Sequence, residues 1–381
     1  MKKKVLICTI LLSLTAIFFT DCERRSEFRW GIKVGDLTYN ENAIFLGNEE
    51  LTLLSEVSAN SLIFNGTKGA LKSVTNNSIL IISVSEKTPY GLLRKVVSIK
   101  ANGSGLEFTT IDASLPETIK EGEIKFKKVL SETEFSLKSK IDGVLAKGLE
   151  KSFDGLAVTM NELIIYDDGS KTARFNGSIG ISTQIDLFIK IEASAIKEIN
   201  VTSTLNKIDE VSLSANGSLN GMQEVTLAHF IHKPVVIDSL VFVPEIKINC
   251  GFDGTSVSGV ASGVRQDRII TSSFNFRDSK WSADPISHSE TYDFSKPQLT
   301  DNTDLKIFSG PEISINLFGV SVQIIRSAGF YSLEADKTEN PFWRLFIGNE
   351  GTNNIKSTIL GFSKDYSSNI LTEPSEIGNG K

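Results

Sequence analysis

Apolar and polar residues alternate with a period of two over much of the second half of the chain. Between residues 185 and 193 every odd position is apolar, and three of the four even positions are charged. Successive side chains of a β-strand point to opposite faces, so this pattern predicts strands with one buried and one exposed face. A sheet with one wet face is typically antiparallel. The alternation returns at residues 199–205, 211–215, 313–317, 320–324 and 343–347.

Asn-Gly and Asp-Gly pairs lie between many of these runs. Such pairs supply the positive φ angles of tight hairpin turns, and inside a long strand they can mark a bulge instead. Because the runs are long, we expect a mainly β fold of long antiparallel twisted strands, forming a curled sheet or an incomplete barrel or sandwich. The pairs are Asn65-Gly66, Asn102-Gly103, Asp168-Gly169, Asn176-Gly177, Asn216-Gly217 and Asn220-Gly221.

Helical patterns are few. Pro116 and Glu117 fit the first turn of a short helix that would end by Gly122. Apolar residues at helical spacing between residues 140 and 153 predict a second helix, although two glycines within it weaken this prediction.

The pattern changes in character near residue 155. Before it the predicted strands are short and mixed with turns, and after it they are long and regular. We therefore expect an N-terminal β-rich module over residues 22–154, a long-stranded antiparallel β domain over 155–372 and a flexible tail over 373–381. The alternative is one continuous sheet whose first layer is the N-terminal part.

The first residues have the pattern of a secretory signal. Lys2 to Lys4 precede a mainly apolar stretch from Val5 to Phe19, which is short for a membrane-spanning helix. Cys22 follows after Thr20 and Asp21, and this arrangement resembles the export segment of bacterial lipoproteins. Phe19 and Asp21 stand where that family usually has an aliphatic and a small residue.

This resemblance covers residues 1–22 alone. It implies that residues 1–21 are removed as a signal peptide, that Cys22 is acylated and that the protein is lipid-anchored in the cell envelope, at the outer membrane or the cell surface. The alternative is ordinary signal cleavage with an incidental Cys.

Charge and cysteine content narrow the function further. Residues 1–21 carry three Lys and one Asp, so their removal changes the formal net charge from −6 to −8. An acidic domain argues against nucleic acid as a partner, because phosphate binding needs a positive face. With Cys22 acylated, Cys250 has no partner for an intrachain disulfide, and the alternating residues around it predict a buried structural thiol.

No recognisable catalytic, metal-binding or cofactor motif occurs. His229 and His232 would point to opposite faces of a strand and could not readily share a metal. Asp167-Asp168-Gly169 is predicted to be a hairpin turn, and the oxygen-rich segment 301–304 an exposed loop without the calcium-binding pattern. We expect no catalytic residues, no metal and no cofactor, and the ligand-binding residues are unknown from sequence.

The leading hypothesis is a non-enzymatic surface or periplasmic protein that binds a partner or has a structural role. A second hypothesis is a carrier of a lipid or other apolar ligand in a curled-sheet cavity. A third is a glycan hydrolase with a carboxylate pair. The partner would then be a protein, a glycan or an apolar ligand, in addition to the membrane. The aromatic residues considered for a cavity are Phe188, Phe274, Phe276 and Phe318.

Overall fold

The computed structural model describes residues 33–148, 155–284, 287–355 and 358–380. Strands make up 71% of it and helices 5%, which confirms the mainly β prediction. The chain divides into two compact units. Unit 1 consists of the chain up to Gly122 and two later segments, Ile191–Ala195 and Asp238–Val241. Unit 2 consists of Glu123–Lys190, Ile196–Ile237 and the chain from Phe242 onward.

Unit 1 contains a six-stranded sheet of order β3-β6-β7-β8-β5-β4, in which β3 and β6 pair in parallel. Its apolar side chains, such as Leu62, Phe64 and Phe108, are fully buried in one cluster. Its elements are β1 (Lys33–Val34), β2 (Leu37–Tyr39), β3 (Ala43–Leu46), α2 (Asn48–Leu51), β4 (Leu54–Val57), β5 (Ser61–Phe64), the 3₁₀ helix η2 (Gly69–Ser73), β6 (Ile79–Ile82), β7 (Leu92–Asn102), β8 (Gly105–Asp112) and α3 (Leu115–Thr118).

The two helix predictions have different outcomes. The first is confirmed by α3, whose capping box joins Ser114 and Glu117: the Glu117 carboxylate accepts from the Ser114 backbone N–H at 3.0 Å, and the Ser114 hydroxyl accepts from the Glu117 N–H. The second is wrong. Gly143 has a φ of +82°, a turn conformation, and the chain from Val144 continues as a strand.

Most of the remaining strands are longer than those of unit 1. They are β9 (Ile119–Leu130), β10 (Phe135–Lys140), β11 (Val144–Gly148), β12 (Leu156–Asp167), β13 (Thr172–Glu192), β14 (Ala195–Asn216), β15 (Leu219–Asn220), β16 (Gln223–His232), β17 (Val235–Ile237), β18 (Leu240–Ser256), β19 (Val260–Arg277), β20 (Lys280–Ala283), β21 (Ser287–Leu299), β22 (Thr303–Leu317), β23 (Val320–Ala335), β24 (Trp343–Ile355), β25 (Tyr366–Leu371) and β26 (Ser375–Gly380), with the 3₁₀ helix η3 (Glu132–Glu134) after β9.

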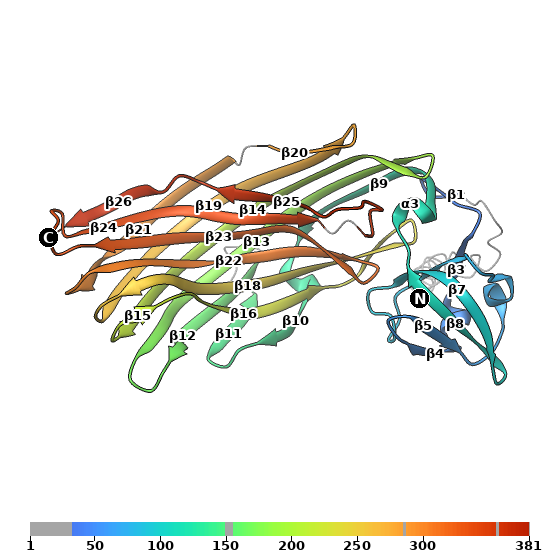
Figure 1. Ribbon diagram of the computed structural model, residues 1–381, viewed down its shortest axis with the longest axis horizontal. Coiled ribbons are helices and arrows are strands. Elements are labelled where there is room, and N and C mark those ends of the chain that lie inside the picture. Colours follow the sequence, from blue (N-terminus) through green and yellow to red (C-terminus); the bar gives the residue numbers. More distant parts are fainter. Residues whose placement is uncertain (1–32, 149–154, 285–286, 356–357, 381) are drawn as a thin grey trace, which may run out of the picture. The chain divides into compact units, whose positions relative to one another are not determined.

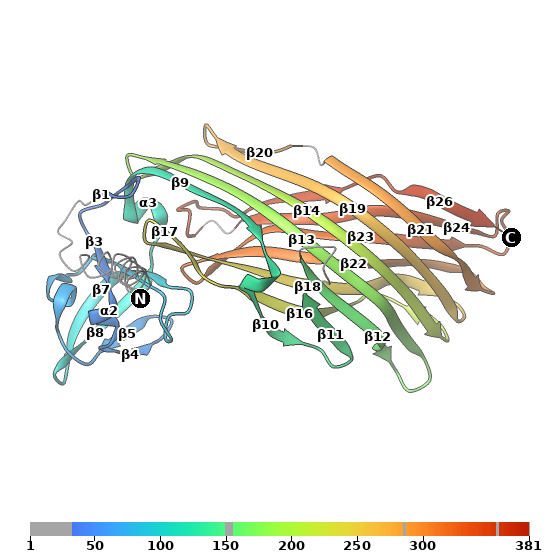
Figure 2. The ribbon, with the colours of Figure 1, turned by 180° about the vertical axis from the view of Figure 1, so that it is seen from behind.

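Together with β1 and β2, these strands form two ten-stranded sheets. The first large sheet has the order β1-β2-β9-β13-β14-β19-β20, with β12 on β13, β11 on β12 and β21 on β19. The second large sheet has the order β10-β16-β18-β22-β23-β24-β25, with β15 and β17 on β18 and β26 on β24. Figures 1 and 2 show the long strands of unit 2 running side by side with a pronounced twist. One sheet curls strongly, as half of a barrel.

The sequence alternation corresponds to the burial of these strands. On β13, Ile185, Ile189 and Ile191 are at most 2% exposed, whereas the even-numbered residues between them are partly exposed. The buried faces of the two large sheets are turned toward each other, because side chains of one sheet bond to the other across the interior of unit 2. The core of unit 2 is therefore the layer between the sheets.

On one side of unit 2 the sheet edges meet through side chains. β20 and β21 form the edge of the first large sheet, β25 and β26 that of the second, and no ladder joins these strands within the described residues. Instead Trp281 stacks on Tyr366, with ring centroids 4.7 Å apart, and Phe276 packs on Phe362 at 4.6 Å. We call this junction the seam.

The C-terminal segment differs from its prediction. Residues 373–381 were expected to form a flexible tail, but Ser375–Gly380 is strand β26, which pairs with β24 between Trp343 and Ile347. Its glycines allow close packing: a Cβ at Gly378 would overlap the Phe294 ring, and one at Gly380 would lie 2.7 Å from the Trp343 ring. The pairing supplies backbone hydrogen bonds that composition does not indicate.

Candidate functional site

A cluster of charged and polar side chains crosses the core of unit 2. We call it the interior cluster. Its members come from both large sheets: Lys207 and Asp209 from β14, Arg268 from β19, Glu290 from β21, Ser309 from β22 and Asn349 from β24.

Lys207 connects β14 to β22. Its ammonium group donates to Asp209 Oδ2 at 2.9 Å, to the Ser309 carbonyl at 2.6 Å and to the Ser309 hydroxyl at 3.2 Å. The Ser309 hydroxyl in turn donates to Asp209 Oδ2 at 2.7 Å. The Lys207 side chain is 0% exposed. Its two bonds to Ser309 link the two large sheets, whereas Asp209 lies on the same strand as Lys207.

Arg268 makes the corresponding link from β19 to β24. Its Nη1 donates to the Gly348 carbonyl at 2.7 Å and to Asn349 Oδ1. Its Nε lies 3.1 Å from Glu290 Oε2, an ion-pair contact that lacks hydrogen-bond geometry. Burial lowers the pKa of Arg268, and the neighbouring carboxylates of Asp209 and Glu290 oppose that shift.

The chemistry of the cluster is limited by its burial. Burial lowers the pKa of Lys207; Asp209 opposes this shift and Arg268 adds to it. A lysine 3.2 Å from a serine hydroxyl is an arrangement that can activate a nucleophile. Ser309 is only 2% exposed, however, and a substrate could not reach it without opening the core. The geometry suits a connection between sheets.

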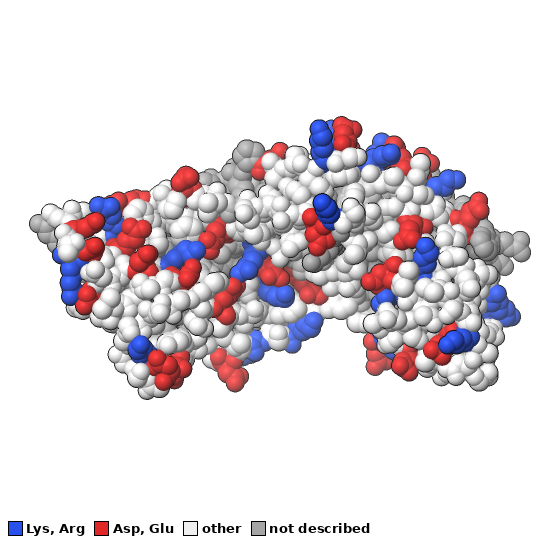
Figure 3. Space-filling view, viewed as in Figure 1, with Lys and Arg blue, Asp and Glu red and all other residues white. Residues whose placement is uncertain are grey.

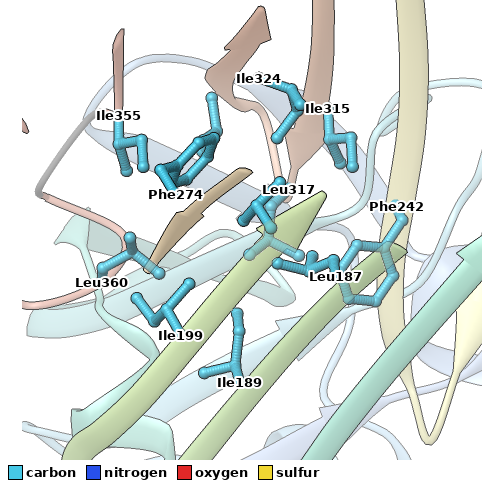
Figure 4. Close-up of a pocket in the computed structure, with 12 residues that line it drawn as sticks. Leu187, Ile189, Ile199, Phe242, Phe274, Ile315, Leu317, Ile324, Ile355 and Leu360 are labelled. Carbon is cyan, nitrogen blue, oxygen red and sulfur yellow. The ribbon is translucent and has the colours of Figure 1, made fainter. Parts of the chain in front are cut away.

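An apolar cavity lies between the same sheets (Figure 4). It measures about 30 Å³, and no polar atom lines it. Its walls are Leu187, Ile189, Ile199, Val201, Phe242, Phe274, Ile315, Leu317, Val322, Ile324, Ile355 and Leu360. This volume is far below the roughly 300–1,000 Å³ of typical ligand pockets.

Only one of the four phenylalanines considered for a ligand cavity lines it. Phe274 does so. Phe188 instead lies under the Lys125 ammonium group, 5.9 Å from the ring centroid, and Phe276 packs in the seam. Phe318 lies in the turn after β22 with a φ of +52°.

A larger hollow of about 380 Å³ lies on the outer face of the second large sheet. We call it the outer groove. Phe308 and Ala328 line it, and so do Met222 and Leu371, which are 57% and 72% exposed. The residues that line it lie on β22, β23, β24 and β25, apart from Met222. Its full lining is Met222, Phe308, Arg326, Ala328, Glu350, Gly351, Thr352, Asn369 and Leu371.

The charged groups of the outer groove already have partners. Arg326 donates to Glu224, and Glu350 accepts from Lys306 at 2.9 Å. Figure 3 shows basic and acidic side chains interspersed on this face rather than gathered into one patch. Paired, mixed charges do not select a ligand of one sign, so the distinguishing feature of the groove is its exposed apolar side chains.

The sequence candidates do not converge on one site. His229 lies 2.9 Å from Glu245, whereas His232 lies 3.2 Å from Glu134. Among the described residues, no three His, Cys, Asp or Glu side chains lie close enough together to hold a metal ion. The described chain likewise contains no helix with the length and apolar character needed to cross a membrane.

The turn, loop and cysteine predictions can be located individually. Asp168 lies in the predicted turn between β12 and β13, and Asp301 forms an ion pair with Lys337 at 3.1 Å just before β22. Cys250 is buried, and burial raises the pKa of its thiol. Cys22 lies outside the described residues.

Comparison of the chain with protein-family models, with curated proteins and with solved structures found no match. Function must therefore be argued from the residues themselves. The interior cluster was missed in the sequence although a signal existed: Lys207 and Asp209 occupy the same alternating positions as Leu205 and Val211 on the apolar face. The outer groove had no such signal, because its residues come from separate strands.

Proposed function

We propose that this protein is a non-enzymatic binding protein of the cell envelope, anchored by acyl chains on Cys22, and that it binds a partner protein in the outer groove. The observation that supports this function is the groove itself. Its volume of about 380 Å³ is within the usual range for binding pockets, and two large apolar side chains that line it are exposed.

The groove chemistry favours apolar side chains of a partner. Burial of Met222 and Leu371 against a partner would remove apolar surface from water, at about 25 cal/mol per Å². Methionine adapts its shape to the surface it contacts. Arg326 and Glu350, already paired within the sheet, would lie at the polar rim of such an interface.

The two alternatives have weaker support in unit 2. A lipid carrier needs a cavity far larger than the apolar one of about 30 Å³, so its two large sheets would have to separate. A glycan hydrolase needs two carboxylates on either side of a bond. The lining of the outer groove contains one, Glu350, and Lys306 binds it.

Site-specific photocrosslinking in the native host tests the binding function. A photoreactive amino acid would replace Met222 or Leu371, with Val257 as the control because it is 61% exposed and lies outside the groove. We expect one protein to crosslink at both groove positions and not at the control, and Met222→Ser to weaken its binding. Equal crosslinking at all three positions would contradict the proposal.

The lipid anchor is tested separately. Metabolic labelling with a fatty-acid analogue should mark the full-length chain, and Cys22→Ala should abolish the label and release the protein from the membrane fraction. An unlabelled chain whose mature N-terminus lies elsewhere would leave ordinary secretion as the better account.

A further inference from the structure

His232 lies at the end of β16, next to η3, and both of its ring nitrogens contact an oxygen atom. Nδ1 lies 2.5 Å from the carbonyl oxygen of Lys233, and Nε2 lies 3.2 Å from Oε2 of Glu134. His232 is only 2% exposed, so bulk water does not compete for these contacts. The Phe135 ring of β10 packs edge-on against the imidazole, with ring centroids 5.0 Å apart.

Neither of these two oxygens can donate a hydrogen bond. A carbonyl oxygen only accepts, and so does an ionised carboxylate. Hydrogen bonds from Lys128 and His232 hold the pKa of Glu134 below its usual range against the opposing effect of burial, so Glu134 is ionised wherever a histidine titrates. A neutral imidazole has one N–H and would leave the other oxygen facing a lone pair. The imidazolium ion has two N–H groups and satisfies both contacts.

The charged groups around His232 favour the same form of the ring. Glu134 contacts the ring through Oε2, and its other carboxylate oxygen accepts from the Lys128 ammonium of β9 at 2.7 Å. On β18, the other neighbour of β16, Glu245 bonds to His229 instead. The negative charge of Glu134 therefore stabilises the protonated imidazole. Within the described chain the remaining titratable side chains of η3 and β10 form no ion pair with His232; they are Glu132, Lys138 and Lys140.

We propose that His232 is a pH-sensitive latch, which as the imidazolium ion holds η3 and the start of β10 against β16. The latch is complete below a pH of about 6.5, where histidine is ordinarily protonated. As the pH rises and the ring loses a proton, Nδ1 keeps its N–H, because the Lys233 carbonyl is part of the backbone and cannot turn away. Nε2 then releases Glu134, whose side chain is 32% exposed and can turn to solvent.

The position of the latch determines what its release changes. β10 is the end strand of the second large sheet, and Phe135 at its start pairs with His232. The Lys233 N–H also donates to the Glu134 carbonyl at 2.8 Å, so the backbone joins the same two segments. Loss of the latch therefore loosens the start of β10 and exposes backbone groups of β16, which another strand could then bind.

Nitrogen-15 NMR of the histidine rings tests the latch directly, because the sequence has three histidines and protonation of a ring nitrogen changes its chemical shift. His229 is the matched control: its Nε2 lies 2.9 Å from Glu245 Oε2, a contact that a neutral ring satisfies by donating from Nε2. As the pH rises, we expect His232 to change from the doubly protonated ring to the Nδ1–H tautomer, and His229 to end as the Nε2–H tautomer. The proposal is overturned if His232 is neutral at a pH of about 6 or becomes the Nε2–H tautomer.

Amide hydrogen exchange measures the loosening of the edge. After correction for the pH dependence of the chemical exchange rate, protection of the Lys233 N–H should fall about fivefold as His232 loses its proton. The Ile141 N–H, which donates to the Leu227 carbonyl at 3.1 Å just after the other end of β10, should keep its protection. The fall should disappear in His232→Gln and persist in His229→Gln. Constant protection of Lys233 in the unmodified chain would refute the latch even if His232→Gln does not fold.

Discussion

Replacing Asp209 with alanine removes the acceptor of two hydrogen bonds inside the interior cluster. Asp209 Oδ2 accepts from the Lys207 ammonium at 2.9 Å and from the Ser309 hydroxyl at 2.7 Å, and the Asp209 side chain is only 6% exposed. Each hydrogen bond to a charged group contributes about 1.5–3 kcal/mol. Removal of one partner of a buried ion pair costs about 3–5 kcal/mol, because the other charge is left unpaired. We expect Asp209→Ala to lower the free energy of unfolding by about 3–5 kcal/mol.

Urea denaturation followed by tryptophan fluorescence measures this loss, since Trp281 and Trp343 both lie in unit 2. With a slope of about 3 kcal/mol per M of urea, the midpoint should fall by about 1–1.7 M. Asp186→Ala is the matched control. Asp186 also pairs with a lysine, Lys127 at 3.0 Å, but its side chain is 43% exposed, so its loss should cost about 0–1 kcal/mol. Equal effects of the two changes would refute the reasoning.

The effect of Asp209→Ala also depends on pH. Burial lowers the pKa of Lys207 in the folded state below its value of about 10.4 in the unfolded chain. At a pH between the folded and the unfolded pKa of Lys207, the unfolded state binds one more proton than the folded state. The free energy of unfolding therefore rises with pH between these two pKa values. Because Asp209 opposes the shift, its removal lowers the folded pKa further and widens the window. The deficit of the variant should therefore shrink as the pH approaches about 10, and a deficit that grows would contradict the assignment.

Three further outcomes follow from individual residues. Hydrogen bonds from the backbone and hydroxyl of Ser170 lower the pKa of Asp168 to about 2. The Asp168 carboxylate should therefore stabilise the turn fully above its ordinary pKa of 3.8, and this stabilisation should be lost as the pH falls through about 2. An NMR titration that finds an ordinary pKa for Asp168 would contradict this. Gly177→Ala, at φ +124° and against a backbone carbonyl, should cost more than about 2 kcal/mol in urea denaturation, whereas Gly169→Ala, at φ +86° in open space, should cost about 1–2 kcal/mol. The Cys250 thiol should resist iodoacetamide at pH 8 until unfolding, as peptide mass mapping would show; rapid labelling of the native protein would mean that it is accessible.

Period-two alternation was sufficient to predict the long strands, because burial of one face is a local property of a twisted antiparallel sheet. Ile185, Ile189 and Ile191 illustrate this, since each is buried where the pattern requires. Asn176-Gly177 lies within β13 with Gly177 at positive φ, as expected for a bulge, whereas Asn102-Gly103 ends β7 at a hairpin.

The interior cluster was harder to predict because polar residues on an alternating strand are normally assigned to the wet face. Lys207 and Arg268 are on the buried face because carboxylates balance their charge, Asp209 on the same strand and Glu290 on β21. The neutral groups to which they donate across the core, on Ser309 and Gly348, are 102 and 80 residues away in sequence. The outer groove depends on which strands become neighbours: Ala328 and Gly351 form a hollow only because β23 lies beside β24. Neither the partners of the interior cluster across the core nor the strands that adjoin each other at the outer groove can be read from a local window of sequence.

The pairing of β14 with β19 has a consequence for how the chain is made. Residues 217–259, which include β15 to β18, are synthesised between these two partners. One edge of β18 cannot pair until β22 has been synthesised. β13 can close one edge of β14 immediately through a tight turn, but the other edge remains open until residue 277 has emerged. Throughout that interval an amphipathic strand with unpaired backbone groups is available to any other chain. We therefore expect an intermediate ending between β14 and β19 to be the form most prone to aggregation and most dependent on a chaperone.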